Sequence, residues 1–309
     1  MNETNISVIT CFYNAEDFIG EFIEHIEEQS YQEFELILVN DGSTDHGGEI
    51  VDRYLKRFDN IKYISQSNKG QGEARNEGFR HAKGKYLYYL DVDDRIKPDA
   101  LGKMISIAES CNADIVTFNS INYDYDFIEE QKSPYKKSKV NRGIYDALTF
   151  LDTSLRNQSL YTPVWLYFYR HDFLKNSGVL FLPIVHEDCI YTIHSLLNAN
   201  NVYYLDEVLH ERRIAIGSIM HKEISEWRID CAIKVMTDAE ELYNNSYDKH
   251  IKSVLKRWNY LCSTLAVSAV EDSKYRKKYR KQMLVYFLKH AYMMDFKCSV
   301  RLLMLFLKK

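Results

Sequence analysis

The most constraining feature of the sequence is a regular alternation of short apolar runs and amphipathic segments over residues 5–120. The apolar runs are rich in β-branched and aromatic residues, as buried strands are, and occupy residues 6–10, 35–39, 62–65, 86–90 and 114–118. The segments between them repeat apolar residues at helical spacing, as 18–26 does. Strands that alternate with helices over short connections build a mostly parallel sheet with helices on both faces, so we predict an α/β fold.

The pattern weakens after residue 120. We expect an irregular excursion over 121–142, a helix within 144–156, a helix from about Glu187 followed by a strand, and helices from about 222 to the end. A chain of 309 residues forms one large domain or two ordinary ones. We therefore expect a catalytic domain over 1–220, with halves 1–120 and 121–220, and a C-terminal helical region over 221–309.

Three polar clusters follow the predicted strands, and sheets of this kind bind ligands beyond the carboxyl ends of their strands. The clusters are FYN at 12–14, NDGSTD at 40–45 and DVDD at 91–94. The last cluster places Asp91, Asp93 and Asp94 within four positions, where like charges repel one another. A positively charged partner is expected there. If the strand continues, Asp91 and Asp93 point to the same side and address one ligand.

The first turn, TCFYNAE at 10–16, contains no glycine, and the sequence has no G-x-x-x-x-G-K-[ST] loop. Backbone N–H groups therefore cannot cradle a diphosphate in either of the common ways. A divalent cation held by carboxylates is the usual alternative.

These motifs, in this order, resemble the nucleotide-sugar-binding half of family 2 glycosyltransferases with the GT-A fold. The resemblance runs through YN, NDGSTD, NKGQGEARN and LDVDD over residues 5–120, with a looser match to the acceptor-side half over 178–219. It implies an inverting enzyme that uses Mn²⁺ or Mg²⁺. The enzyme would move a hexose or N-acetylhexosamine from a UDP-sugar to a hydroxyl of a growing bacterial surface glycan, either free or lipid-linked.

The resemblance also implies roles on the donor side. Asp93 would hold the metal, and Asp91 would reach the ribose or a metal-bound water. Asp41 would accept the uracil N–H, for which the alternative is an Asx-turn. Tyr13 and Asn14 would pack against uracil and ribose. Asn68 and Arg75 would flank the nucleotide, unless Arg75 is a helix-surface arginine.

On the acceptor side, Asp188 would be the general base, an Asp near its ordinary pKa that is ionised at neutral pH. Glu187 is the weaker candidate for that role and would lie near the acceptor, and either carboxylate could instead cap a helix. Arg212 and Arg213 would contact the diphosphate or lie at the surface. Trp165 would stack on the acceptor sugar or belong to the core.

Charge is unevenly distributed along the chain. Residues 273–309 hold eleven Lys/Arg and one acid, a charge of about +10. Because the whole chain has a net charge of −4, the remaining residues carry about −14. Residues 274–309 interleave these charges with apolar side chains, which fits attachment to an anionic membrane surface, or packing on the protein or a second copy. The negative net charge argues against a nucleic-acid partner. We see no membrane-spanning run and no secretory leader, and the six cysteines are scattered. We therefore expect a cytoplasmic protein, with the membrane's inner face as its site if the tail attaches.

Two other functions stay open. A nucleotidyltransferase with a related sheet would activate sugars and would need a glycine-rich N-terminal signature. A non-catalytic glycan-binding module would be expected to have damaged acidic motifs.

Overall fold

The computed structural model describes residues 5–123, 135–137, 139–214, 224–290 and 292. The chain divides into two compact units. The sheet unit comprises Met1–Pro183 with Glu187–Ala215, and the helical unit comprises Ile184–His186 with Ile216–Lys309.

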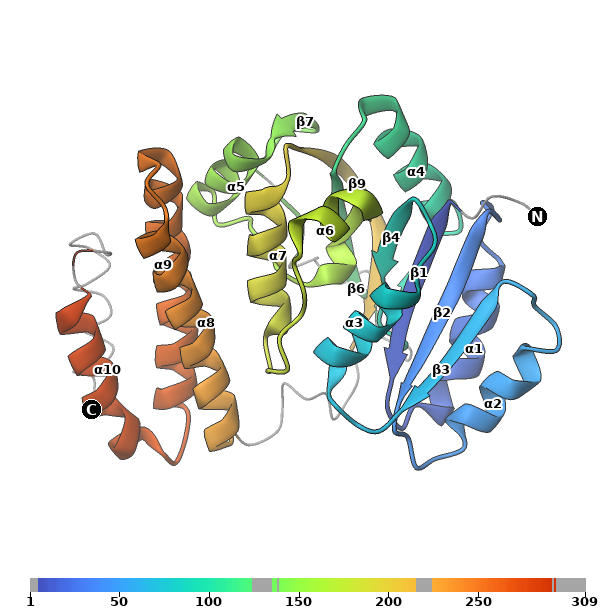
Figure 1. Cartoon of the computed structure of the whole chain (residues 1–309), viewed down its shortest axis with the longest axis horizontal. Coiled ribbons are helices and arrows are strands. Elements are labelled where there is room, and N and C mark those ends of the chain that lie inside the picture. Colours follow the sequence, from blue (N-terminus) through green and yellow to red (C-terminus); the bar gives the residue numbers. More distant parts are fainter. Residues whose placement is uncertain (1–4, 124–134, 138, 215–223, 291, 293–309) are drawn as a thin grey trace. The chain divides into compact units, whose positions relative to one another are not determined.

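A mixed sheet forms the centre of the sheet unit (Figure 1). Its strands are β1 (Ile6–Phe12), β2 (Phe34–Asp41), β3 (Ile61–Gln66), β4 (Tyr86–Tyr89), β5 (Arg95–Ile96), β6 (Ile115–Tyr123), β7 (Gly143–Asp146), β8 (Tyr167–Arg170) and β9 (Asn201–Arg213). They are ordered β3-β2-β1-β4-β8-β6-β9-β5, and β7 also pairs with β9. The α/β class is confirmed. The pairings among β1 to β4 and between β6 and β9 are parallel, whereas β8 lies antiparallel between β4 and β6.

Helices cover both faces of this sheet (Figure 1). They are α1 (Glu16–Glu27), α2 (Gly47–Tyr54), α3 (Gln71–His81), α4 (Ala100–Cys111), α5 (Ala147–Arg156), the short 3-10 helix η1 (Val164–Leu166), α6 (His171–Ser177) and α7 (Glu187–Asn198). On one face, Val8 packs in a core with Ile19 of α1, Val51 of α2 and Met104 of α4. On the other face, α3 packs on β1 so closely that a Cβ on Gly78 would lie 2.4 Å from Ile9. Alternate residues of β1 thus face opposite helix layers.

Ala15 is the N-cap of α1, and α4 begins at Ala100. α3 ends at His81 with Ala82 as its C-cap, and Gly84 follows in the loop before β4. A Cβ on Gly84 would lie 2.5 Å from the Ser7 backbone N, so this position is kept small by close packing on β1.

The described part of the helical unit contains α8 (Glu226–Asn245), α9 (Lys249–Glu271) and α10 (Arg276–Lys289). Side chains of Ser225 and Asp248 cap α8 and α9 by accepting backbone N–H groups. In α10, Tyr279, Met283 and Phe287 are buried at a spacing of one helical turn, whereas Leu284, Val285 and Leu288 are exposed. No helix within the described ranges is both long and apolar enough to span a bilayer. The rest of the predicted basic tail, residues 291 and 293–309, lies outside those ranges.

Candidate active site

The acidic residues after β4 lie in a turn. β4 ends at Tyr89, and the Asp94 N–H donates to the Asp91 carbonyl oxygen at 3.2 Å. The strand geometry expected for Asp91 and Asp93 is therefore wrong, because the strand has already ended. The turn still gathers negative charge: burial, followed by the charges of Asp94 and Asp91, raises the pKa of Asp93 to about 7.

The Asp94 side chain joins this turn to the end of β9. One of its carboxylate oxygens accepts the Arg213 backbone N–H at 2.8 Å, and the other lies 3.2 Å from His210 Nε2, without hydrogen-bond geometry. Burial raises the pKa of Asp94 and lowers that of His210 to about 3, so the imidazole is neutral at physiological pH. The end of β9 thus holds the acidic turn in place.

Arg75 points inward from α3 and joins two carboxylates. Its Nη2 donates to Asp91 Oδ1 at 2.9 Å, and its Nη1 donates to Glu187 Oε1 at 2.6 Å. The residue is 5% exposed, so the alternative of a helix-surface arginine is wrong. Its guanidinium carbon lies 5.4 Å from the centre of the Phe181 ring. The positive partner expected beside the acidic cluster is therefore, at least in part, a side chain of the protein.

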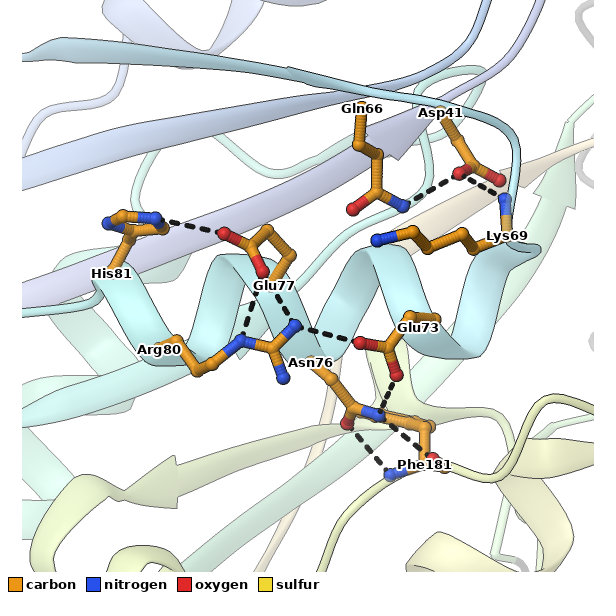
Figure 2. Close-up of polar contacts among 9 residues, drawn as sticks. All are labelled: Asp41, Gln66, Lys69, Glu73, Asn76, Glu77, Arg80, His81 and Phe181. Carbon is orange, nitrogen blue, oxygen red and sulfur yellow. Dashed lines mark hydrogen bonds and ion pairs between the residues drawn. The ribbon is translucent and has the colours of Figure 1, made fainter.

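Two neighbours of Arg75 on α3 contact the segment that contains Phe181, as Figure 2 shows for Asn76. The Asn76 side chain donates to the Phe181 carbonyl and accepts the Phe181 N–H, both at 2.9 Å. A Cβ on Gly72 would lie 2.5 Å from the Leu182 carbonyl oxygen, so only glycine allows this approach. Gly72, Arg75 and Asn76 share one face of α3, whereas Glu73, Glu77 and Arg80 form surface ion pairs on another.

Asp41 holds the loop that leads into α3 (Figure 2). Its buried carboxylate accepts hydrogen bonds from the Lys69 N–H, the Gly70 N–H and Gln66 Nε2, at 2.7–2.8 Å. Three of its roughly four acceptor positions are therefore used, which leaves about one for a ligand. The hydrogen bonds of Asp41 thus reach residues 66–70, in place of the local Asx-turn that was the alternative.

The remaining donor-side candidates surround the same strand ends. Asn14 adopts a positive φ of 50°, and its side-chain oxygen accepts the Thr44 N–H at 2.8 Å. It thereby ties the loop after β1 to the loop after β2. Tyr13 is 51% exposed, and Asn68 is also exposed. The Asn68 backbone lies against Gly42, where φ is +78° and a Cβ would be 2.6 Å from the Asn68 N.

Asp188 is the second residue of α7, directly after the ion-paired Glu187. It is partly exposed, and one of its carboxylate oxygens accepts the Cys189 N–H at 2.8 Å. Desolvation raises the pKa of Asp188 above its ordinary value, and the charge of Arg75 opposes this shift. The expectation of an ordinary pKa is therefore wrong. A raised pKa makes the carboxylate a stronger base once it is ionised.

The other acceptor-side candidates are engaged with the protein. Trp165 is 4% exposed and stacks on His210 with the ring centres 4.1 Å apart, which favours the core alternative. Glu187 is buried against Arg75 and does not line an open surface. Arg212 donates to the Tyr135 hydroxyl at 3.1 Å, and the guanidinium carbon of Arg213 lies 4.7 Å from the centre of the Phe18 ring.

Sequence reasoning missed three neighbours of these groups. Gln71 Nε2 donates to Asp91 Oδ1 at 3.1 Å, and the Tyr135 ring packs edge-on against Trp165. The Cys11 thiol is close enough to Arg75 and Asp91 for their charges to affect its pKa, which burial raises. Gln71 could have been predicted to lie beside Arg75, because it precedes Arg75 by one turn of the same helix. No feature of the sequence indicates that Tyr135 contacts Trp165.

The acidic turn can hold a divalent cation only as a partial set of ligands. Within the described ranges, no three His, Cys, Asp or Glu side chains are arranged to hold a metal ion. Mg²⁺ is commonly bound by one or two carboxylates together with substrate phosphates and water. Burial, followed by the charges of Asp94 and Asp91, raises the pKa of Asp93, and a bound cation would favour its ionised form.

Comparison with known proteins places these observations in a family. The family model described as glycosyl transferase family 2 matches residues 7–164, about half of the chain. The chain is 29% identical over 217 residues to the uncharacterized glycosyltransferase YibD of Escherichia coli, a match covering 68% of this chain and 62% of YibD.

Two solved structures share the fold. Staphylococcus aureus TarS 1–349, in complex with UDP-GlcNAc, has a TM-score of 0.69 at 18% identity, with 94% of this chain and 88% of that chain covered. The mannosyltransferase PcManGT of Pyrobaculum calidifontis, in complex with GDP-Man and Mn²⁺, has a TM-score of 0.58 at 16% identity, with 99% and 87% covered.

Proposed function

Because the chain belongs to glycosyl transferase family 2, we propose that it transfers a hexose or N-acetylhexosamine from a UDP-sugar to a hydroxyl of a growing bacterial glycan, with inversion. The observation that carries this proposal is that Asp91 of the acidic turn and Glu187, which precedes Asp188 in the chain, both pair with the buried guanidinium of Arg75. Donor-binding and proton-accepting carboxylates must lie close together for a direct displacement.

The donor half of the site is proposed to lie at the ends of β1, β2 and β4. The UDP-GlcNAc bound to TarS supports a uridine donor. The remaining acceptor position of Asp41 would take the uracil N–H, and the exposed Tyr13 ring would pack beside the base. Asn14 and Asn68 would shape the rim of this pocket. Arg212 and Arg213 at the end of β9 would contact the diphosphate.

Asp93, with Asp91, would hold Mn²⁺ or Mg²⁺ together with the diphosphate. The Mn²⁺ in the PcManGT complex supports this cofactor. When bound, such a cation offsets the charge that develops on the departing nucleotide.

Asp188 is proposed as the general base. Its carboxylate is partly exposed, whereas that of Glu187 is occupied by Arg75, so Asp188 is the better placed of the two. It would take the proton from the acceptor hydroxyl as the oxygen attacks the anomeric carbon. The bond to the UDP oxygen would break on the opposite face, so one displacement inverts the anomeric centre and needs no covalent intermediate.

The proposed acceptor is a surface-glycan intermediate, and a lipid-linked saccharide is the form favoured by the basic C-terminal segment. The two-unit organisation is consistent with a catalytic domain over 1–220 and a helical region over 221–309, a boundary that we keep as a proposal.

UDP release from a panel of UDP-sugars tests the function, with saccharide acceptors and Mn²⁺ present or chelated. We expect release that needs both, and a fall of about 10²–10⁴-fold in Asp188→Asn. Asp52→Asn, on the exposed surface of α2, is the matched control and should match the parent. A sugar-activating enzyme would consume nucleoside triphosphate instead, and a binding module would release no UDP; either result contradicts the proposal.

A further inference from the structure

Arg75 is the cation that the two ends of the proposed site share. One of its terminal nitrogens contacts Asp91, the first residue of the acidic turn, and the other contacts Glu187, the first residue of α7. The partners lie 16 and 112 positions away in the sequence, so they come from distant parts of the chain. The guanidinium is thus a direct link between the donor-side carboxylate and the segment that carries Asp188.

A planar guanidinium is suited to this task. It presents its N–H donors in a fixed fork, so two carboxylates bound to its two ends take a defined spacing and orientation. A lysine ammonium has the same charge but lacks the fork. The Phe181 ring, 5.4 Å from the guanidinium carbon, restricts the side chain further. Because Arg75 is almost fully buried, its ion pairs are little weakened by water.

Gly72 and Asn76, the neighbours of Arg75 that face residues 181–182, hold the chain but not the carboxylates, whereas Gln71 adds a second hydrogen bond to Asp91 but does not reach Glu187. Asn76 binds the Phe181 backbone, and Gly72 lies against the Leu182 carbonyl oxygen. These contacts fix where residues 181–182 run along α3. The direction of the Glu187 carboxylate, five residues later, is fixed by its contact with Arg75.

We propose that Arg75 is a positioning residue that sets the spacing between the donor-side carboxylate Asp91 and the base-bearing start of α7. This inference rests on the proposed function, and it replaces the expectation that Arg75 flanks the nucleotide. Arg75 acts through Asp91 and Glu187 and does not touch the substrate. Its loss should therefore slow the transfer step much more than it weakens nucleotide binding.

The test compares Arg75→Lys, Arg75→Gln, Glu187→Gln and the double variant with the parent. Arg80→Gln is the matched control, because Arg80 lies on the same helix but pairs with Glu73 and Glu77 at the surface. We expect kcat to fall about 10-fold in Arg75→Lys and about 100-fold in Arg75→Gln, with UDP affinity by calorimetry changed less than about 3-fold. The double variant should be no slower than Arg75→Gln alone, since both changes break the same link. Arg80→Gln should keep the parent kcat.

Three results would overturn the inference. In the first, Arg75→Lys retains the parent kcat. In the second, the losses of kcat in Arg75→Gln and Glu187→Gln multiply in the double variant. In the third, UDP affinity falls as much as kcat, which would make Arg75 a nucleotide ligand. If the parent releases no UDP from any UDP-sugar, the proposed function fails instead. The link is then judged by urea unfolding of the same variants and of the added double variant Arg80→Gln/Glu187→Gln, in which Arg75 and Glu187 must show coupled effects on stability while Arg80 and Glu187 must not.

Discussion

Lys137 is a buried cation that the proposed chemistry does not use. Its Nζ donates to the Phe118 carbonyl oxygen at 3.0 Å, and the rings of Tyr161, Tyr167 and Tyr204 are centred 5.6–5.8 Å away. Burial lowers the pKa of Lys137 to about 7, and the three rings partly offset the cost of burying its charge. The side chain thus anchors the segment that presents Tyr135 to Arg212.

This lowered pKa predicts a pH-dependent stability. The unfolded chain protonates Lys137 below its ordinary pKa of about 10.5, whereas the folded chain does so only near pH 7. The folded state therefore loses stability as the pH falls through this window and gains it as the pH rises. Relative to Lys137→Met, the parent should gain on the order of a few kcal/mol between about pH 7 and pH 9.5.

Urea unfolding of both proteins at several pH values measures this difference. Lys56→Met, a change at the surface after α2, is the control and should follow the parent at every pH. A stability difference between the parent and Lys137→Met that stays constant across the window would contradict the pKa assignment.

The residue types in the candidate site could be predicted from the sequence, but the directions in which their side chains point could not. The motif order pointed to the strand ends where Asp41 and Asp91 lie. It could not indicate that Arg75 faces inward, because helical spacing gives the faces of α3 without showing which face meets which partner. The burial of Trp165 could not be predicted either, because an aromatic residue suits a core and a sugar-binding surface equally well.

At the scale of elements, α3 joins the two halves of the sheet unit. It packs against β1 and β2 through Gly78 and against residues 181–182 through Gly72. A helix in contact on two sides needs small residues where backbone approaches it. The NKGQGEARN motif is therefore explained in large part by packing, with Gly72 and Asn76 directed at residues 181–182 and Arg75 at Glu187.

Gly72→Ala tests this role of α3. The new Cβ would lie 2.5 Å from the Leu182 carbonyl oxygen, so backbone must move, at a cost of about 1–3 kcal/mol of unfolding free energy. Gly102→Ala on α4 is the matched control. Its new Cβ would meet only the Tyr31 side chain at 3.6 Å, so the better helix propensity of alanine should leave stability unchanged or raise it by up to about 1 kcal/mol. Thermal and urea unfolding measure both, and equal effects would contradict the close-approach explanation.

Apolar strands were predictable even where they are short, as β4 is, whereas short strands with polar residues were not. β1 and β2 follow the β-branched runs that defined them in the sequence. β5 and β7 have two and four residues, too few to show an alternation of apolar and polar positions. The antiparallel insertion of β8 between β4 and β6 depends on long-range pairing, which no local pattern contains.

At the scale of the whole molecule, charge and apolar surface coincide in α10. This helix buries Tyr279, Met283 and Phe287 and leaves Leu284 and Leu288 exposed beside lysines such as Lys281. An exposed face of this kind fits the proposed contact with an anionic membrane surface.

Vesicle co-sedimentation tests this contact. The protein should bind vesicles containing anionic phospholipid at low salt, bind neutral vesicles weakly, and lose most of its binding at about 0.5 M salt. Leu284→Ser/Leu288→Ser should weaken the binding, whereas Leu261→Ser, an exposed leucine of α9, serves as the control. Binding that ignores lipid charge would contradict an electrostatic contact, and a concentration-dependent dimer without vesicle binding would assign the face to a second copy.

The most direct test of the central claim is a crystal structure of the protein with UDP and Mn²⁺. We predict the uracil beside Asp41 and the cation between Asp93 and the diphosphate, with the Arg75 link to Glu187 intact. A nucleotide bound away from the ends of β1, β2 and β4, with Asp93 directed to bulk solvent, would contradict the claim.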